Sequence, residues 1–186
     1  DPIHKNDRNR SIAASQFLPL TDIAGVSLYS LQVNREEEAA ETFGDKVTDL
    51  APFLTDFADT AAAMRNLDLI VSVATSVVHL AGALGQPVWT LLPCMPDWRW
   101  LLEREDSPWY PTMRLFRQHR RGDWESVIER VRATLTQRLE RRGLGGRGSL
   151  LLNLDPHIAQ RDGAVEYRIL RRRIGVEAKI ALAFEL

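Results

Sequence analysis

Short apolar runs alternate with amphipathic stretches along this chain. Leu69–Val73 is almost wholly apolar, and Val88–Leu92 is a second run of the same kind. Such runs are typical of parallel strands, because both faces of each strand are buried under helices. The pattern predicts an α/β protein with a Rossmann-like parallel sheet and helices on both faces.

The other elements alternate in the same way. Further strands are expected at Val26–Leu31, Lys46–Leu50 and Met113–Arg117. Helices are expected at Ala13–Leu20, where the signal is weak, and at Glu36–Phe43, Asp56–Arg65 and Trp124–Arg141. Thr55 is a candidate cap of the Asp56–Arg65 helix.

The segment between the two apolar runs carries the clearest chemical signal. Thr75 or Ser76 is expected to cap a short helix that Gly85 and Pro87 end. The expected core face of this helix consists of Val77, Leu80, Ala81 and Leu84. Its free N–H groups and positive dipole end would lie at the carboxyl edge of the sheet, where open α/β folds bind ligands. The segment therefore predicts an anion site suited to phosphate.

The character of the chain changes after Arg142. Residues 143–149 are glycine-rich and indicate a flexible linker. From Val176 to Phe184 apolar residues alternate with others, which fits a half-buried strand, although the alanines also allow a helix. We place a domain at 1–142 and a linker with an unassigned tail at 143–186, and we expect the domain to fold without that tail.

Composition narrows the class of protein. The chain has 186 residues, 45% of them hydrophobic and 26% charged, with a net charge of −1. This near-neutral charge gives no global field for nucleic acid or an anionic membrane. The lone Cys94 excludes an internal disulfide, and no apolar run is long enough to span a bilayer. We expect a cytoplasmic protein without a metal, and because the chain starts at Asp1 in a polar stretch, we expect upstream sequence to be missing.

A long aromatic segment, Pro93–Pro111, follows the second buried run and is too long for a passive connector. With other segments it resembles the bacterial heptosyltransferase-like glycosyltransferases, in particular those fused to tetratricopeptide repeats. The resemblance spans roughly residues 1–135. It is carried by His4–Ser11, Ser30–Gln32, Leu54–Ala61, Ser72–Pro87, Pro96–Leu101 and Trp109–Gln118.

This resemblance implies the donor-binding half of a two-domain glycosyltransferase of the GT-B type. Such an enzyme uses a nucleotide diphosphate sugar for metal-independent, inverting transfer. The acceptor, a glycan or protein, and the general base would belong to an upstream half, so this fragment alone is expected to be inactive. One position departs from the family, which usually has an aspartate where this chain has Ala74.

Three residues form the expected phosphate site. Thr75 and Ser76 offer hydroxyl and N–H groups, and His79 returns to the same helix face one turn later. His79 would stabilise the departing diphosphate. The alternative is a capped helix whose histidine packs beside the sheet.

The remaining candidates depend more on the resemblance. Lys5, Arg8 and Arg10 would contact phosphate, or else form a solvated loop. The resemblance places the ribose and base at Gln32, Thr55 and Asp56. The alternative is that Gln32 only pins a loop and Thr55 only caps its helix. Asp97 and Arg99 would line the donor pocket, whereas Trp100, Trp109 and Tyr110 are expected mainly to pack.

The rival hypothesis is a catalytically degenerate domain that serves as a scaffold or interaction module of a repeat protein. Ala74 and the unmatched tail favour this alternative. The donor sugar, its base and the acceptor cannot be read from the chain, because one fold serves many specificities.

Overall fold

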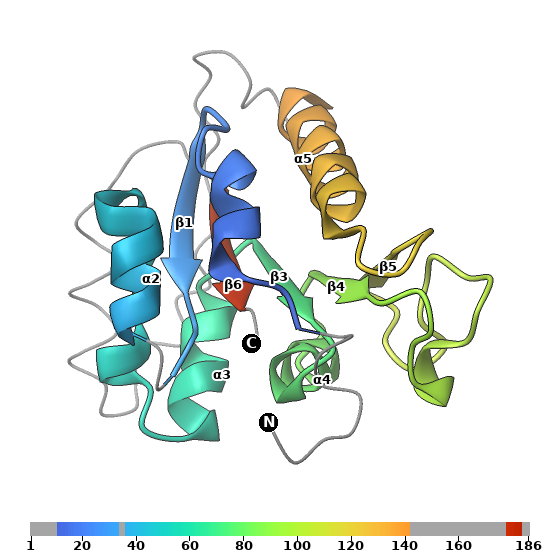
Figure 1. The fold of residues 1–186 in the computed structure, drawn as a ribbon. Helices are drawn as coiled ribbons and strands as arrows, with labels where there is room; N and C mark the ends of the chain where they lie inside the picture. Colours follow the sequence, from blue (N-terminus) through green and yellow to red (C-terminus); the bar gives the residue numbers. More distant parts are fainter. Residues whose placement is uncertain (1–10, 34–35, 142–177, 184–186) are drawn as a thin grey trace.

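The computed structural model describes residues 11–33, 36–141 and 178–183. Within these residues it shows one sheet in which every strand pairing is parallel, an α/β Rossmann-like fold (Figure 1). The strands are β1 (Val26–Ser30), β2 (Val47–Asp49), β3 (Leu69–Val73), β4 (Val88–Leu92), β5 (Met113–Arg117) and β6 (Ala178–Ala183). Their order across the sheet is β2-β1-β6-β3-β4-β5.

The helices lie close to the predicted positions. The α-helices are α2 (Glu36–Phe43), α3 (Phe57–Arg65), α4 (Ser76–Ala83) and α5 (Trp124–Arg141). Four 3-10 helices also form: η1 (Ala14–Leu20), η2 (Gly44–Lys46), η3 (Ala51–Phe53) and η4 (Trp98–Trp100). The weak signal at Ala13–Leu20 thus corresponds to a 3-10 helix, with Pro19 inside it.

The sheet is covered on both faces. On one face, side chains of η1, α2 and α5 pack with Leu69, Val71 and Val73 of β3. On the other face, side chains of α3, α4 and η4 pack with Ile70 and neighbouring strands. Alternate residues of a strand point to opposite faces, so the apolar run of β3 is buried throughout, as its sequence predicts.

The strand β6 occupies the middle of the sheet, between β1 and β3 (Figure 1). Ile180 lies opposite Leu28 on one side and Leu69 on the other. Ile180 and Leu182 join the core of one face, and Ala181 and Ala183 join the core of the other. The alternating segment is therefore a strand buried on both faces, not the half-buried strand or the helix that the sequence allows.

This placement corrects the division drawn after residue 142. Residues 178–183 belong to the same sheet as the preceding domain, so a boundary after residue 142 would divide this sheet. Without β6 the backbone N–H and C=O groups on the facing edges of β1 and β3 would lose their partners. The glycine-rich composition of 143–149 marks a change of texture in the sequence, but the core continues beyond it.

The segment before β5 runs along the outer edge of that strand. Asp106 forms an antiparallel bridge with Arg114, and the Leu115 N–H donates to the Glu105 carbonyl at 2.7 Å. Arg104 holds Asp106 with two hydrogen bonds. This edge is thereby covered rather than left free to pair with another chain.

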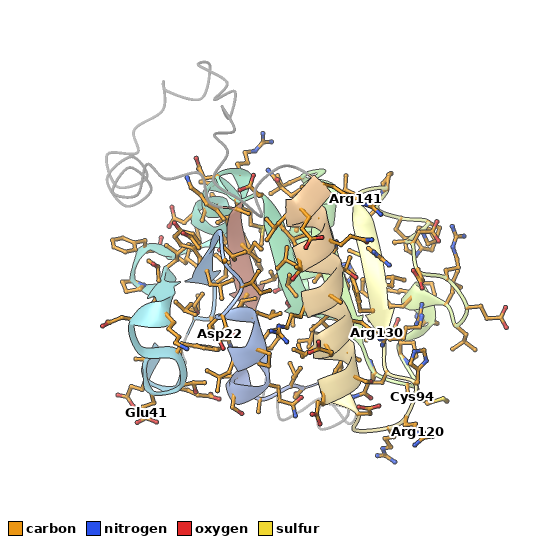
Figure 2. The ribbon with its side chains drawn as sticks, turned by 90° about the horizontal axis from the view of Figure 1, so that it is seen from above. Asp22, Glu41, Cys94, Arg120, Arg130 and Arg141 are labelled. Atoms are coloured by element: carbon orange, nitrogen blue, oxygen red, sulfur yellow. The ribbon has the colours of Figure 1, made fainter. Side chains whose placement is uncertain are left out.

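The long helix α5 lies across one face of the sheet (Figure 2). Arg130, near its middle, donates to the Ser126 carbonyl at 3.3 Å and also to the carbonyl of Arg117, the last residue of β5.

Among the helices of the described residues, none combines the length and apolar character that crossing a bilayer requires.

Candidate functional site

The helix α4 begins at the carboxyl end of β3, as the sequence predicts. Thr75 is its N-cap, with extended backbone, and the Thr75 hydroxyl oxygen accepts a hydrogen bond from the Val77 N–H at 3.2 Å. Ser76 is exposed and Thr75 is half-buried. A helix start leaves several N–H groups without partners inside the helix. The start of α4 thus carries two hydroxyl groups at this edge, and the hydroxyl of Thr75 already serves as the partner of the Val77 N–H.

The far end of α4 also follows the prediction. Gly85 has a positive φ of 69°, which suits the residue just beyond a helix end. The buried face differs in detail, because Val78 and Ala81 are buried whereas Val77, Leu80 and Leu84 are only half-buried.

The point at which the chain passes from β3 into α4 is typical of a ligand site in this class of fold. After β1 the chain enters α2 on one face, whereas after β3 it enters α4 on the opposite face. In open α/β sheets, ligands usually bind outside the carboxyl ends of the strands, near such a change of face. Gln32 follows β1 at the same edge. It is half-buried, and its backbone N–H donates to the Ser30 hydroxyl oxygen at 3.2 Å.

The imidazole of His79 is held by two aromatic side chains. Its Nδ1 lies 3.0 Å from the Tyr110 hydroxyl. Its ring stacks on Trp100 with the centroids 5.3 Å apart and the planes 24° from parallel. Trp100 is only 2% exposed, as expected for a packing residue. His79 is therefore anchored, while the ring itself is half-buried.

The electrostatics of His79 link it to the aromatic segment. Burial lowers the pKa of His79 most strongly, and the positive charge of Arg99 lowers this pKa further, while Asp97 opposes the shift. The ring is therefore neutral near pH 7, because its ordinary pKa of 6.5 is already below that value. Of the predicted site residues, the structure thus places Asp97 and Arg99 within electrostatic reach of His79.

Asp97 and Arg99 form a local unit at η4. The Asp97 carboxylate accepts from the Arg99 N–H at 3.0 Å and pairs with the Arg99 guanidinium at 2.8 Å. That guanidinium also lies 5.3 Å from the centre of the Trp98 ring. Trp98 is 70% exposed and Trp109 is 58% exposed, so the expectation that Trp109 mainly packs is wrong. The Trp109 indole N–H instead donates to the Arg99 carbonyl at 3.0 Å.

Thr55 and Asp56 take part in the capping of α3. Asp56, not Thr55, is the N-cap, and its carboxylate accepts from the Ala58 and Asp59 N–H groups at 2.7 and 2.9 Å. Thr55 donates to the Asp59 carboxylate through both its N–H and its hydroxyl, and these bonds lower the pKa of Asp59. The prediction that Thr55 caps this helix is therefore wrong, because the carboxylate of the next residue, Asp56, accepts the free N–H groups.

The remaining predicted phosphate contacts, Lys5, Arg8 and Arg10, lie outside the described residues. Cys94 is an exposed free thiol beyond β4, at the same end of the molecule as Arg120 (Figure 2). Among the residues that the structure describes, no three His, Cys, Asp or Glu side chains gather in a metal-binding arrangement.

Sequence reasoning missed the hydroxyl of Tyr110 as a polar contact of the site. It assigned this tyrosine to packing, because nothing in the spacing of His79 and Tyr110 shows that they meet. A usable signal is the residue type, because a buried tyrosine hydroxyl usually finds a hydrogen-bond partner.

The fold is that of an α/β domain of the Rossmann-like type, and the capped start of α4 lies at the carboxyl edge of its sheet. The chain is 34% identical over 101 residues to the protein FlbA of Caulobacter vibrioides. That similarity covers 54% of this chain and 16% of FlbA, so the chain spans a small part of the relative. No family model matches the chain, and no solved structure matches it.

Proposed function

We propose that this domain binds a nucleotide diphosphate sugar and serves as the donor half of a two-domain, GT-B type inverting glycosyltransferase. The observation that carries the proposal is the capped start of α4 at the reversal point of the sheet, with His79 anchored one turn into the helix. The resemblance of the sequence to heptosyltransferase-like enzymes supports the same conclusion.

The chemistry of the reaction explains why these groups suit it. Negative charge develops on the diphosphate as the glycosidic bond breaks, and fixed donors stabilise that charge. The hydroxyls of Thr75 and Ser76, together with the N–H groups of the first turn, form such a set. His79 adds a ring N–H donor, and Arg99 adds positive charge nearby.

The acceptor side of the reaction belongs to another part of the proposed enzyme. An inverting transfer needs a base that activates the acceptor, a glycan or a protein, and we assign this base to an upstream half. The chain alone is then expected to bind donor without transferring sugar. We place the intact enzyme in the cytoplasm, with the nucleotide sugar as its soluble substrate.

A second candidate function is an inactive domain that acts as a scaffold of a tetratricopeptide repeat protein. Ala74 favours it. This residue stands directly before the cap of α4, where the resembling enzymes usually have aspartate, and it packs against the apolar core of one face. An aspartate at this position would offer a carboxylate to order the turn, and alanine does not.

Calorimetry with UDP and ADP at low salt tests the proposal on the full chain. The double variant Thr75→Val, His79→Ala removes two of the proposed contacts and should weaken binding by about 1 to 3 kcal/mol. The matched control is Thr112→Val, His119→Ala, which changes the same residue types at exposed positions.

Each outcome of this experiment has a defined meaning. Weaker binding by the first double variant alone supports the α4 site. Equal affinity in all three proteins would place the nucleotide elsewhere. Absence of binding by the unaltered chain would favour the scaffold.

A further inference from the structure

The hydroxyl of Tyr110 lies 3.0 Å from Nδ1 of His79, in a contact between the aromatic segment and α4. The two rings meet edge to face, with centroids 5.8 Å apart and an interplanar angle of 63°. Trp100 covers a face of the same imidazole. The ring of His79 is thus fixed both by stacking and by a directional polar contact.

The direction of this hydrogen bond depends on which nitrogen of the imidazole carries the proton. A neutral imidazole has one nitrogen that donates and one that accepts. The phenol O–H is a good donor, and a half-buried hydroxyl proton without an acceptor is costly. A Tyr110 hydroxyl that donates to Nδ1 leaves the ring proton on the remaining nitrogen, Nε2.

Gly82 makes the contact possible. It lies three residues after His79 and hence on the same face of α4. A Cβ added at Gly82 would lie 2.5 Å from Cγ and 2.6 Å from Cδ1 of the Tyr110 ring, which is closer than side chains approach one another. The Tyr110 ring therefore occupies the space that a side chain at position 82 would need.

We propose that Tyr110 is a positioning residue, which holds His79 with its proton on Nε2 so that this N–H can donate to the diphosphate of the bound nucleotide. The inference rests on the proposed function. It assigns Gly82 a specific part as well, because any larger residue there displaces the tyrosine. Asp97 and Arg99 supply the surrounding charge, whereas Tyr110 sets which nitrogen donates.

Nitrogen-15 NMR of the histidine rings in the full chain tests the arrangement without any nucleotide. Above pH ~8 the imidazole is neutral, and the two nitrogens then have distinct shifts according to which is protonated. We expect Nδ1 of His79 to be an unprotonated, hydrogen-bonded nitrogen. In Tyr110→Phe, which keeps the ring, and in Gly82→Ala, which displaces it, the Nδ1 resonance should move.

Nucleotide affinity provides the functional measurement. Tyr110→Phe should weaken UDP binding about three- to tenfold, the range expected for one lost hydrogen bond. The matched control is Thr112→Val, which removes a hydroxyl two residues further along the chain. That hydroxyl donates to the Gln86 carbonyl at 2.8 Å and has no bond to His79, so both readouts should stay unchanged.

The outcomes separate this inference from the proposed function. A proton on Nδ1 of His79 in the unaltered chain, or equal UDP affinity in the unaltered chain and Tyr110→Phe, overturns the positioning role while nucleotide binding stands. If the unaltered chain binds no UDP, both proposals fall. A shifted Nδ1 resonance with weakened binding in Tyr110→Phe and Gly82→Ala supports the inference.

Discussion

Asp68 and Lys179, which are far apart in the chain, are joined by two hydrogen bonds. The Lys179 N–H donates to the Asp68 carboxylate at 2.8 Å, and the Asp68 N–H donates to the Lys179 carbonyl at 2.8 Å. Asp68 directly precedes β3, and Lys179 lies near the start of β6. The carboxylate thus continues the strand pairing by one step and fixes where β6 begins.

Replacing Asp68 by alanine should therefore destabilise the protein. The Lys179 N–H would lose its acceptor in a half-buried position, and the expected cost is about 1 to 3 kcal/mol. Urea unfolding measures this loss. Asp45→Ala, at an exposed acid in η2, is the control and should change the midpoint little. Equal effects of the two substitutions would show that the Asp68 contact contributes nothing to stability.

The buried position of β6 gives a second prediction. Leu182 is fully buried in the core of one face, so Leu182→Ala should cost about 2 to 5 kcal/mol through lost packing and the cavity left behind. Leu102→Ala makes the same chemical change at an exposed loop position and should cost far less. Thermal unfolding of both variants compares them directly. Similar melting temperatures would mean that β6 is not part of the core.

The cap of α3 can be tested by two substitutions at one position. Asp56→Ala removes the acceptor of two N–H groups and should cost about 0.5 to 2 kcal/mol. Asp56→Asn also caps well and should retain most of the stability. Urea unfolding gives the two values, and UDP calorimetry shows whether Asp56 has a binding role as well. A loss of UDP affinity in Asp56→Asn at unchanged stability would assign this residue to the ligand.

The pKa of His79 predicts how stability depends on pH. Because burial lowers this pKa below its ordinary value of 6.5, the unfolded chain binds the proton more readily than the folded chain. The contribution of the neutral ring to stability is present above pH 6.5 and is lost as the pH falls through the lowered pKa. Stability should consequently fall on acidification through this window.

His79→Gln removes this titration and should reduce the change in urea midpoint between pH 7 and pH ~5. His119→Gln, at an exposed position, serves as the control for losing a histidine. If His79→Gln and His119→Gln show the same pH dependence as the unaltered chain, the pKa of His79 does not differ between the folded and unfolded states.

The local elements could be predicted closely because local sequence determines them. Val88–Leu92 is a strand with the predicted bounds, since a short and almost wholly apolar run is typical of a strand buried on both faces. Thr75 is one of the two predicted caps of α4, and a hydroxyl directly before an apolar helix commonly caps it. For α3 the sequence predicted Thr55, whereas the cap is Asp56, because either side chain can cap and only the backbone geometry decides.

The long-range relationships could not be predicted in the same way. Nothing between Val176 and Phe184 states which strands pair with it, because the order of strands depends on packing across the whole sheet. The contact of His79 with Tyr110 is likewise set by how the aromatic segment folds back onto α4. Gly82 became informative only once the ring beside it was known, since a glycine within a helix has many possible causes.

The place of β6 in the sheet also bears on how the protein is made. Ribosomes deliver the chain from its amino end, so β1 through β5 emerge before the strand that joins β1 to β3. Until then the edges of these two strands are open to pairing with other chains. A nascent chain therefore passes through a period in which the edges of β1 and β3 are exposed. During this period, early release from the ribosome or chaperone binding decides between folding and aggregation. Pauses in translation before residue 178 would prolong the exposure.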